Sequence, residues 1–255
     1  MRNVFSFVAL RILAGFAITA LLPALAEPQG AGPMTSQTLM SQMKWRSVGP
    51  YIGGRVVAVT GVPGDDNLFY AGTVGGGVWK SSDEGIKWEN ITDDKLPGPS
   101  ASIGAIAAAP SAPSTLYVGS GEDDIRNDMI PGDGIFKSTD AGKTWEFAGL
   151  RETRSISAIV VSPQDPNVVY ASSMGHVFVP GPDRGVFKST NGGKSWKKIL
   201  FVDDKTGAID LVMDPNHPRV LYATTWQAQR LPWGLISGGP GSGLYKTTDG
   251  GEHWT

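Results

Sequence analysis

The sequence has 255 residues, with 24 acidic side chains, 22 basic side chains and a formal net charge of -2. This balance argues against nucleic-acid binding, which usually needs a basic face. Because the sequence contains no cysteine, it excludes disulfide bonds, a thiol nucleophile and thiolate metal sites. The 34 glycines and 18 prolines indicate a chain interrupted by many turns.

Residues 1–26 have the pattern of a signal peptide. Two arginines supply positive charge, residues 12–22 form an apolar core, and Ala24-Leu25-Ala26 gives the small-x-small pattern of a cleavage site. The core is short for a membrane span, so no span is expected after cleavage, and an uncleaved anchor is the alternative. Residues 27–43 are predicted to be a flexible linker. The mature protein is predicted to be periplasmic or secreted.

A ten-residue phrase occurs four times in the rest of the chain. FKSTDAGKTW, which ends at Trp145, is matched by WKSSDEGIKW, FKSTNGGKSW and YKTTDGGEHW, and the final tryptophans recur every 51–58 residues. A repeat of this period indicates one supersecondary unit that is used several times. The shared pattern is Ser/Thr-x-Asp/Asn-x-Gly-x-x-Trp. Its members are Ser81, Asp83, Gly85 and Trp88; Ser138, Asp140, Gly142 and Trp145; Ser189, Asn191, Gly193 and Trp196; and Thr247, Asp249, Gly251 and Trp254.

Each repeat also contains short apolar runs around the phrase. In the second repeat, residues 103–110 and 116–121 precede it, and two further runs lead into and out of it. Four short strands per unit, bounded by turn residues, are typical of the blades of a β-propeller. Helical repeats would need an internal period near 3.6, which these runs lack. The predicted fold is therefore an all-β propeller of four-stranded antiparallel blades, with about four blades present.

The repeated phrase is predicted to be the hairpin between the third and fourth strands of a blade. Ser138 and Asp140 can hydrogen-bond the backbone of their own turn, and Gly142 can adopt a positive φ. Trp145 can bury a large apolar surface under the turn. Asn191 replaces the aspartate in the third copy, and it can accept the same backbone hydrogens, whereas a catalytic carboxylate would not tolerate the exchange. We therefore interpret the phrase as scaffold.

The four phrases resemble Asp-box repeats, also called bacterial neuraminidase repeats. Such repeats occur in sialidases, xyloglucanases, sortilin-type receptors and photosystem assembly factors, all of which are β-propellers. The stretch from Trp45 to Trp88 is similar, more specifically, to the start of large exported bacterial proteins with sortilin-like propellers, which are often labelled glycosyl hydrolases. The resemblance covers residues 44–255. It implies the propeller fold but says little about function.

The number of blades depends on how the propeller closes, because an open blade leaves an unpaired edge. In one interpretation, residues 44–48 supply the outer strand of the last blade, and four blades close into a ring. In the interpretation we favour, residues 44–255 are the front part of a propeller of seven or more blades. The last phrase ends at Trp254, where a further fourth strand should begin.

The connections between the second and third strands differ among the repeats. We expect them on the face opposite to the repeated turns, where residues 122–133, 174–184 and 226–243 form long irregular loops. Long loops on a rigid scaffold commonly carry binding residues, and adjacent ones can line a shared groove. The predicted ligand-binding residues are Glu122, Asp123, Asp124, Arg126, Asp128, Trp226, Gln229, Arg230 and Trp233.

The chemistry of these loops leaves several interpretations open. Carboxylates in residues 122–128 can act as acid and base in glycoside hydrolysis, bind calcium or simply be solvated. Their spacing is not that of a dedicated calcium loop. Trp226 and Trp233 can stack on sugar rings, anchor a protein or peptide, or pack their own loop. We predict no cofactor and no metal site, because the three histidines are scattered and no phosphate-binding loop occurs.

No catalytic residue is predicted. The Arg-Ile-Pro segment, arginine triad and tyrosine–glutamate pair of sialidases cannot be placed, and residues 48–56 are only loosely similar to the xyloglucanase pattern. The main hypothesis is an exported binding module for a protein or peptide. The alternatives are a glycoside hydrolase of the sialidase or xyloglucanase type, whole or a fragment of one, which would act on a glycan, and a structural or assembly factor.

Overall fold

The computed structural model describes Ser41, residues 55–97 and residues 102–255. From residue 55 onward, the described residues belong to one compact unit, Gly49–Thr255. The predicted signal peptide and nearly all of the predicted linker lie outside the described residues. Within the described ranges, no helix is long and apolar enough to cross a membrane.

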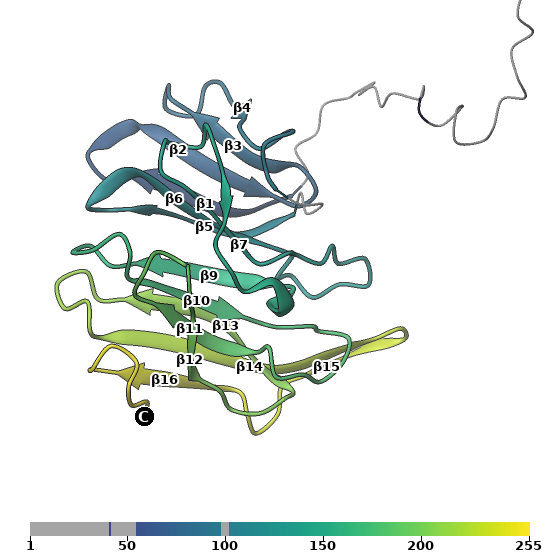
Figure 1. Ribbon diagram of the computed structural model, residues 1–255. Coiled ribbons are helices and arrows are strands. Elements are labelled where there is room, and N and C mark those ends of the chain that lie inside the picture. Colours follow the sequence, from purple (N-terminus) through teal and green to yellow (C-terminus); the bar gives the residue numbers. More distant parts are fainter. Residues whose placement is uncertain (1–40, 42–54, 98–101) are drawn as a thin grey trace, which may run out of the picture. The chain divides into compact units, whose positions relative to one another are not determined.

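The unit is built from four antiparallel four-stranded sheets (Figure 1). A short 3₁₀ helix, η1 (Arg151–Thr153), links the second sheet to the third. In chain order, the strands are β1 (Val56–Val62), β2 (Asp65–Thr73), β3 (Gly77–Ser81) and β4 (Glu89–Asn90); β5 (Ile103–Ala109), β6 (Ala112–Ser120), β7 (Ile135–Ser138) and β8 (Glu146–Phe147); β9 (Ile156–Val161), β10 (Val169–Ser173), β11 (Gly185–Ser189) and β12 (Lys197–Leu200); and β13 (Thr206–Met213), β14 (Leu221–Leu231), β15 (Gly234–Ser237) and β16 (Gly243–Thr247).

The four sheets are consecutive blades of a propeller. Their first strands β1, β5, β9 and β13 pack beside one another in this order. In each of the first three blades, the other strands follow outward in chain order. The predicted all-β propeller of four-stranded antiparallel blades, with about four blades present, is therefore confirmed.

The fourth blade departs from the expected pattern. Strand β14 pairs with both β13 and β16, and its extension pairs with β15 to form a hairpin arm. Residues 226–243 were predicted to be an irregular loop, and this prediction was wrong for 226–237. Residues 226–231 continue strand β14, and Pro232-Trp233 forms a two-residue turn between the paired residues Leu231 and Gly234.

The hydrophobic core is divided among the interfaces between blades. Between the first and second blades, Tyr70 and Val78 pack against Ile106, Phe136 and Trp145. Corresponding clusters fill the interfaces between the second and third blades and between the third and fourth blades. Each blade is therefore held mainly by apolar contact with its neighbours rather than by a core of its own.

The repeated phrases form the turns that follow β3, β7, β11 and β16. In the second copy, the Gly142 backbone N–H donates to Ser138 Oγ at 2.9 Å, and the Thr144 backbone N–H donates to Asp140 Oδ1 at 2.9 Å. Gly142 has a φ of +84°, which glycine adopts without strain. Hydrogen bonds from the side chain and backbone of Thr144, with one from Ser138, lower the pKa of Asp140 to about 2.

The third copy keeps the same turn with an amide in place of the carboxylate. The Ser195 backbone N–H donates to Asn191 Oδ1 at 3.0 Å, and the Gly193 backbone N–H donates to Ser189 Oγ at 2.9 Å. The amide also donates from Nδ2 to Ser195 Oγ at 2.8 Å. The geometry of the turn therefore needs an acceptor at this position, not a negative charge.

The tryptophans of the second and third copies contact the preceding blade and not only their own turn. Trp145 is 9% exposed and donates its indole N–H to Ile91 O at 3.2 Å. Trp196 donates to Ala148 O at 2.7 Å in the same way. Trp88 is 41% exposed and donates to Gly85 O of its own turn at 2.9 Å. The expected burial under the turn is thus not found at Trp88, since the described residues contain no blade that precedes the first.

Candidate functional site

The blades present two different faces. Turns between the first and second strands share one face with the repeated turns: Gly192 N–H donates to Asn167 O at 2.9 Å, and Gly250 N–H donates to Arg219 O at 2.8 Å. We call this the box face; it lies on the left in Figure 1. The opposite face, which we call the loop face, is formed by residues 121–134, 174–184 and 226–242 and by the links between blades.

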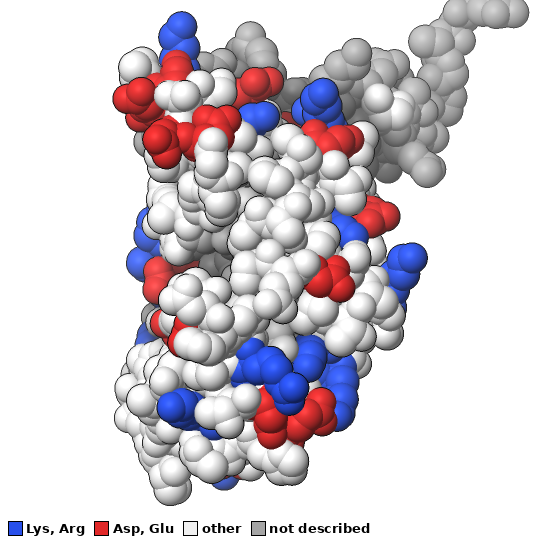
Figure 2. Space-filling view, turned by 90° about the vertical axis from the view of Figure 1, so that its left-hand side faces the viewer, with Lys and Arg blue, Asp and Glu red and all other residues white. Residues whose placement is uncertain are grey.

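The box face carries charges of both signs. Figure 2 shows acidic side chains gathered over the first blade, at the top, and a mixed cluster of basic and acidic side chains toward the bottom. A hollow of about 390 Å³ between the third and fourth blades is lined by Lys188, Arg219, Asp249 and Glu252 among others. Lys188 Nζ donates to Gly250 O at 2.8 Å, so this cation is already used between the blades.

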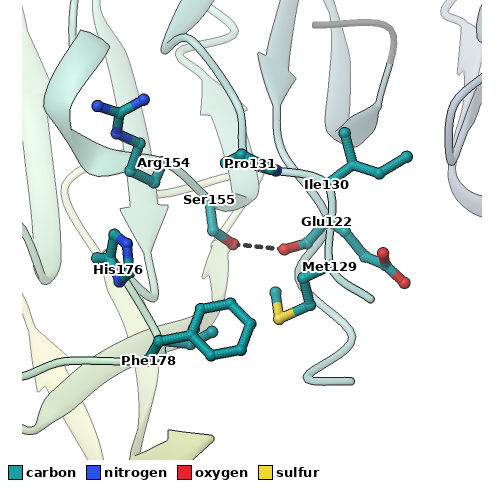
Figure 3. Close-up of a pocket in the computed structure, with 10 residues that line it drawn as sticks. Glu122, Met129, Ile130, Pro131, Arg154, Ser155, His176 and Phe178 are labelled. Carbon is teal, nitrogen blue, oxygen red and sulfur yellow. Dashed lines mark hydrogen bonds between the residues drawn. The ribbon is translucent and has the colours of Figure 1, made fainter. Parts of the chain in front are cut away.

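The loop face contains the predicted acidic residues, and their surroundings differ. Glu122 is fully buried and forms an ion pair with Arg55. Its backbone carbonyl accepts a hydrogen bond from Ser155 Oγ at 2.9 Å (Figure 3). Glu122 is therefore tied into the link between the second and third blades, and it is not a freely solvated carboxylate.

Asp123 is the carboxyl group whose pKa is most altered on this face. One of its oxygens, Oδ1, is buried without a hydrogen-bond partner. Burial raises the pKa of Asp123 to about 7, and the neighbouring charges of Asp124 and Glu122 add to the effect. Asp123 therefore holds a proton up to about neutral pH.

The rest of the acidic loop is exposed to solvent. Asp124 and Asp128 are exposed, and Arg126 Nε lies 3.5 Å from Asp128 Oδ1 in an exposed ion pair, which contributes little to stability. Among the residues that the structure describes, no three His, Asp or Glu side chains are grouped so that they could hold a metal ion. The exposed part of the loop has the geometry of a solvated segment.

The β14–β15 arm joins the connections of three blades. Arg230 Nε donates to Asn127 Oδ1 at 2.5 Å, and its backbone N–H donates to Val177 O at 2.9 Å. Gln229 Nε2 donates to Phe178 O at 3.1 Å. Two of the predicted ligand-binding residues, Gln229 and Arg230, thus hold the second, third and fourth connections together.

The two predicted tryptophans have different surroundings. Trp226 is partly buried and packs against the apolar cluster of Met174, Val177 and Ala228. Trp233 stands at the turn of the β14–β15 arm and is 83% exposed. Trp226 therefore packs the arm onto the third blade, whereas Trp233 is free to contact a partner.

A cavity opens on the loop face between the second and third blades (Figure 3). Its volume is about 80 Å³, and most of its wall is apolar. Figure 3 shows Arg154 and His176 on one side, Phe178 at the bottom and Met129 with Ile130 on the other side. The rings of His176 and Phe178 meet edge to face with centroids 5.8 Å apart. The residues that line it are Glu122, Met129, Ile130, Pro131, Arg154, Ser155, Gly175, His176, Val177 and Phe178.

Of the predicted ligand-binding residues, only Glu122 lines this cavity, and Figure 3 shows its carboxylate pointing away from Arg154 and His176. Arg154 was not among the predicted site residues, because it lies in a link between two blades, whereas the predicted residues lie in connections within blades. Leu150 and Arg154 both have a positive φ, and they flank η1 in this link. In the sequence, Arg154 could have been noticed as part of the mostly charged segment 151–154, which directly precedes an apolar run.

Arg184 was also missed, although it organises the loop face. Its side chain is fully buried. Nη1 donates to Lys205 O at 2.9 Å and to Ala228 O at 3.0 Å, and Nη2 donates to His176 O at 3.1 Å. Burial lowers the pKa of Arg184 from its usual value. In the sequence, Arg184 stands directly before the glycine that leads into the third strand of its blade, and a charged residue at this position could have been noticed. Asp133, which accepts a hydrogen bond from Arg151, occupies the same position in the second blade.

Comparison with known proteins agrees with this geometry. Residues 133–255, just under half of the chain, match the family model described as Sortilin-Vps10, "Sortilin, neurotensin receptor 3". The chain carries an Asp-box β-propeller. The resemblance of this propeller to sortilin-like and glycosyl hydrolase-like propellers, predicted from the repeated phrases, is confirmed.

Curated relatives of the propeller include enzymes. A probable oligoxyloglucan-reducing end-specific xyloglucanase of Neosartorya fischeri is 26% identical over 240 residues, which cover 88% of this chain and 26% of the relative. A xyloglucanase of a Paenibacillus species is 25% identical over 217 residues, which cover 76% of this chain and 20% of the relative. The chain thus spans about a quarter of the length of the curated relatives that it matches.

Solved structures show the same propeller fold. An ancestral GH74 enzyme is 26% identical with a TM-score of 0.59, and the match covers 79% of this chain and 25% of that one. The GH74 xyloglucanase of Xanthomonas campestris is 21% identical with a TM-score of 0.56, and the match covers 76% of this chain and 28% of that one. The propeller is therefore related to xyloglucanase propellers at low identity and over part of their length.

Proposed function

We propose that this chain is an exported binding module whose Asp-box propeller recognises a protein or peptide through its loop face. In this proposal the signal pattern of residues 1–26 directs it to the periplasm or the outside of the cell. The box face serves as scaffold, and the binding residues lie on the connections that differ among blades.

The cavity between the second and third blades carries this proposal. At about 80 Å³ it is well below the ~300 Å³ at which cofactor and small-molecule pockets begin, so it suits one apolar side chain of a ligand. Met129, Ile130 and Phe178 supply its apolar wall (Figure 3). Arg154 and His176 at its side can donate hydrogen bonds to an acidic group or a backbone carbonyl next to that side chain.

Trp233 extends the same surface. It is strongly exposed at the tip of the arm, and the arm is fixed to the second and third connections by Arg230 and Gln229. An aromatic side chain held on a rigid hairpin is a typical anchor in protein–protein contacts. The expected ligand therefore presents an apolar side chain to the cavity and a second apolar surface to Trp233.

A random peptide library displayed on phage tests the proposal. Phage selected on the intact protein should lose binding to the Phe178→Ser variant, because this change removes one wall of the cavity. They should keep binding to Val179→Ser, which alters the adjacent exposed residue outside the cavity. Failure to select any peptide, or equal loss with both variants, would contradict the proposal.

A glycoside hydrolase is the second candidate function, and Asp123 favours it. A carboxyl group that stays protonated near neutral pH is what a general acid in glycoside hydrolysis requires. The relatives that the chain matches in part are xyloglucanases. Against this candidate, Asp123 does not line the cavity, and among the described residues the one carboxylate in the cavity wall is the ion-paired Glu122.

The release of reducing ends from soluble xyloglucan decides between the two candidates. The binding proposal predicts no release by the wild-type protein. Release that is abolished by Asp123→Asn, but kept by Asp66→Asn at an exposed residue of β2, would establish the hydrolase instead.

A further inference from the structure

The β14–β15 arm has one strand edge that no other described segment covers (Figure 1). On the far edge of β14, the Arg230 backbone N–H donates to Val177 O at 2.9 Å, and the Ala228 N–H also points away from β15. Their cross-strand partners, Leu235 and Ser237, are therefore in non-hydrogen-bonded pairs with them. The backbone N–H and C=O groups of Leu235 and Ser237 thus point outward from the arm.

Strand β15 also lacks the features that protect the outer strands of the other blades. β4, β8 and β12 are two to four residues long, and each carries at least one charged side chain. The four residues of β15 include no charge and no proline. Leu235 is 38% exposed, Ile236 is 47% exposed, and Trp233 stands next to them at the turn. An exposed apolar edge of this kind is a template for pairing with another chain.

We propose that the outer edge of β15 binds an extended segment of a partner protein as an additional strand of the arm. The segment forms backbone hydrogen bonds with the outward groups of Leu235 and Ser237. Leu235 and Ile236 lie on opposite faces of the arm, because successive side chains of a strand alternate. A segment that fits therefore carries uncharged apolar side chains on both of its faces. Backbone bonds supply affinity in this mode of recognition, and the side chains supply specificity.

The length of β15 favours a partner segment over a second copy of this chain. Its four residues span about 13 Å, and two such strands bury far less than the ~1,200 Å² at which stable protein interfaces begin. A flexible segment can instead follow the edge and bend onto Trp233. The site is separate from the cavity, because β14 lies between β15 and Val177. The inference therefore goes beyond the function proposed above and does not depend on the cavity.

Subtractive phage selection tests the proposal. A library of linear peptides is depleted on Leu235→Pro and then selected on the wild-type protein. Proline removes the outward N–H of Leu235, and it is tolerated on an edge strand whose N–H faces solvent. Selected peptides should bind Leu235→Val, which keeps this donor, as they bind the wild-type protein, and should bind Leu235→Pro at least about tenfold more weakly. Equal binding to the two variants, or no peptide from the selection, would overturn the proposal.

Two controls distinguish this site from the cavity and from self-association. The selected peptides should keep their binding to Phe178→Ser, which alters the cavity wall. Loss of binding to Phe178→Ser with full binding to Leu235→Pro would overturn the edge site and leave the cavity proposal standing. Light scattering should show the same mass for the wild-type protein and Leu235→Pro. An oligomer that Leu235→Pro dissociates, but Leu235→Val does not, would assign the edge to a second copy and also overturn the proposal.

Amide hydrogen exchange reports the backbone contact directly and needs no variant. In the free protein, the amides of Leu235 and Ser237 should exchange quickly because they face solvent. The amide of Ile236, which is paired with Gln229, should exchange slowly. A selected peptide should slow exchange at Leu235 and Ser237. Binding that leaves both amides in fast exchange would overturn the proposal.

Discussion

The polar groups of the two faces have their hydrogen-bond partners in different parts of the chain. On the box face, Asp140 and Ser138 bond within a turn of a few residues, and the same arrangement recurs in all four copies. On the loop face, Arg184 and Arg230 bond backbone and side chains of other blades. Local bonding allows a turn to be copied from blade to blade. Hydrogen bonds between the connections of different blades instead hold together a surface whose residues differ from blade to blade.

Asp140 on the box face and Asp123 on the loop face have pKa values that are shifted in opposite directions. Hydrogen bonds from Thr144 and Ser138 lower the pKa of Asp140 to about 2. Burial raises the pKa of Asp123 to about 7. The box turn stabilises the charged carboxylate of Asp140, whereas the surroundings of Asp123 stabilise the neutral acid. The two carboxyl groups can therefore be distinguished by titration.

The largest effect is expected at Arg184. Replacing it by Leu removes the guanidinium's hydrogen bonds to four carbonyl oxygens, of which the bond to Ala228 O is fully buried, so Arg184→Leu should lower the free energy of unfolding by about 3–5 kcal/mol. Urea denaturation measures this change. Arg219→Leu removes an exposed arginine with one long hydrogen bond on the box face and should change stability by less than about 0.5 kcal/mol. Equal effects would mean that Arg184 does not organise the loop face.

Substitutions of the box tryptophans should distinguish packing between blades from formation of the turn itself. Trp145→Ala removes a side chain packed against Ile91 of the preceding blade and should cost about 3 kcal/mol. Trp88→Ala removes a largely exposed side chain and should cost less than about 1 kcal/mol. Thermal or urea unfolding compares the two. A larger loss of stability for Trp88→Ala than for Trp145→Ala would contradict the claim that the box tryptophan stabilises the protein through contact between blades.

Asp123 should make stability fall as pH rises. Its folded-state pKa is about 7, above the ordinary value of 3.8, so its contribution is complete below pH 3.8 and is lost as pH rises toward 7. The difference in unfolding free energy between the wild-type protein and Asp123→Asn should decline by about 2–4 kcal/mol over this range and then level off. Urea denaturation at a series of pH values measures it. A difference that grows with pH would refute the assigned protonation state.

The smallest effect is expected from Asp140→Asn. The third box already uses Asn191 in the same bonds, so the variant should keep its turn and lose less than about 4 °C in melting temperature near neutral pH. The pKa of Asp140 is lowered, so its contribution is present above pH 3.8 and is lost as pH falls toward 2. The deficit of the variant should therefore vanish in acid. A deficit that persists at pH 2 would show that charge is not the relevant difference.

The sequence predicts the strands and turns of this fold because their determinants are local. A serine, an acceptor two residues later and a glycine specify the box turn, and the apolar runs around them specify strands. The apolar runs 103–110 and 116–121 are found as strands β5 and β6, although β6 begins four residues before its predicted start. Four copies of each signal reinforce one another, which a single occurrence would not.

The candidate site was harder to predict because it depends on contacts between blades. Asp123 and Asp124 are adjacent in sequence, but Asp123 is partly buried with one buried oxygen, whereas Asp124 is exposed. Trp226 and Trp233 are the same residue type in the same predicted loop, although Trp226 packs against Met174 and Trp233 is exposed. Burial of a loop side chain is decided by the loops that cover it, and residue type alone does not reveal this.

Binding of one selected peptide to two variants tests the division between scaffold and recognition most directly. The measurement is the dissociation constant of a phage-selected peptide for Phe178→Ser on the loop face and for Asp140→Asn on the box face, each checked for an intact fold by its melting curve. The account predicts at least about tenfold weaker binding for Phe178→Ser and unchanged binding for Asp140→Asn. Unchanged binding for Phe178→Ser together with loss for Asp140→Asn would contradict it.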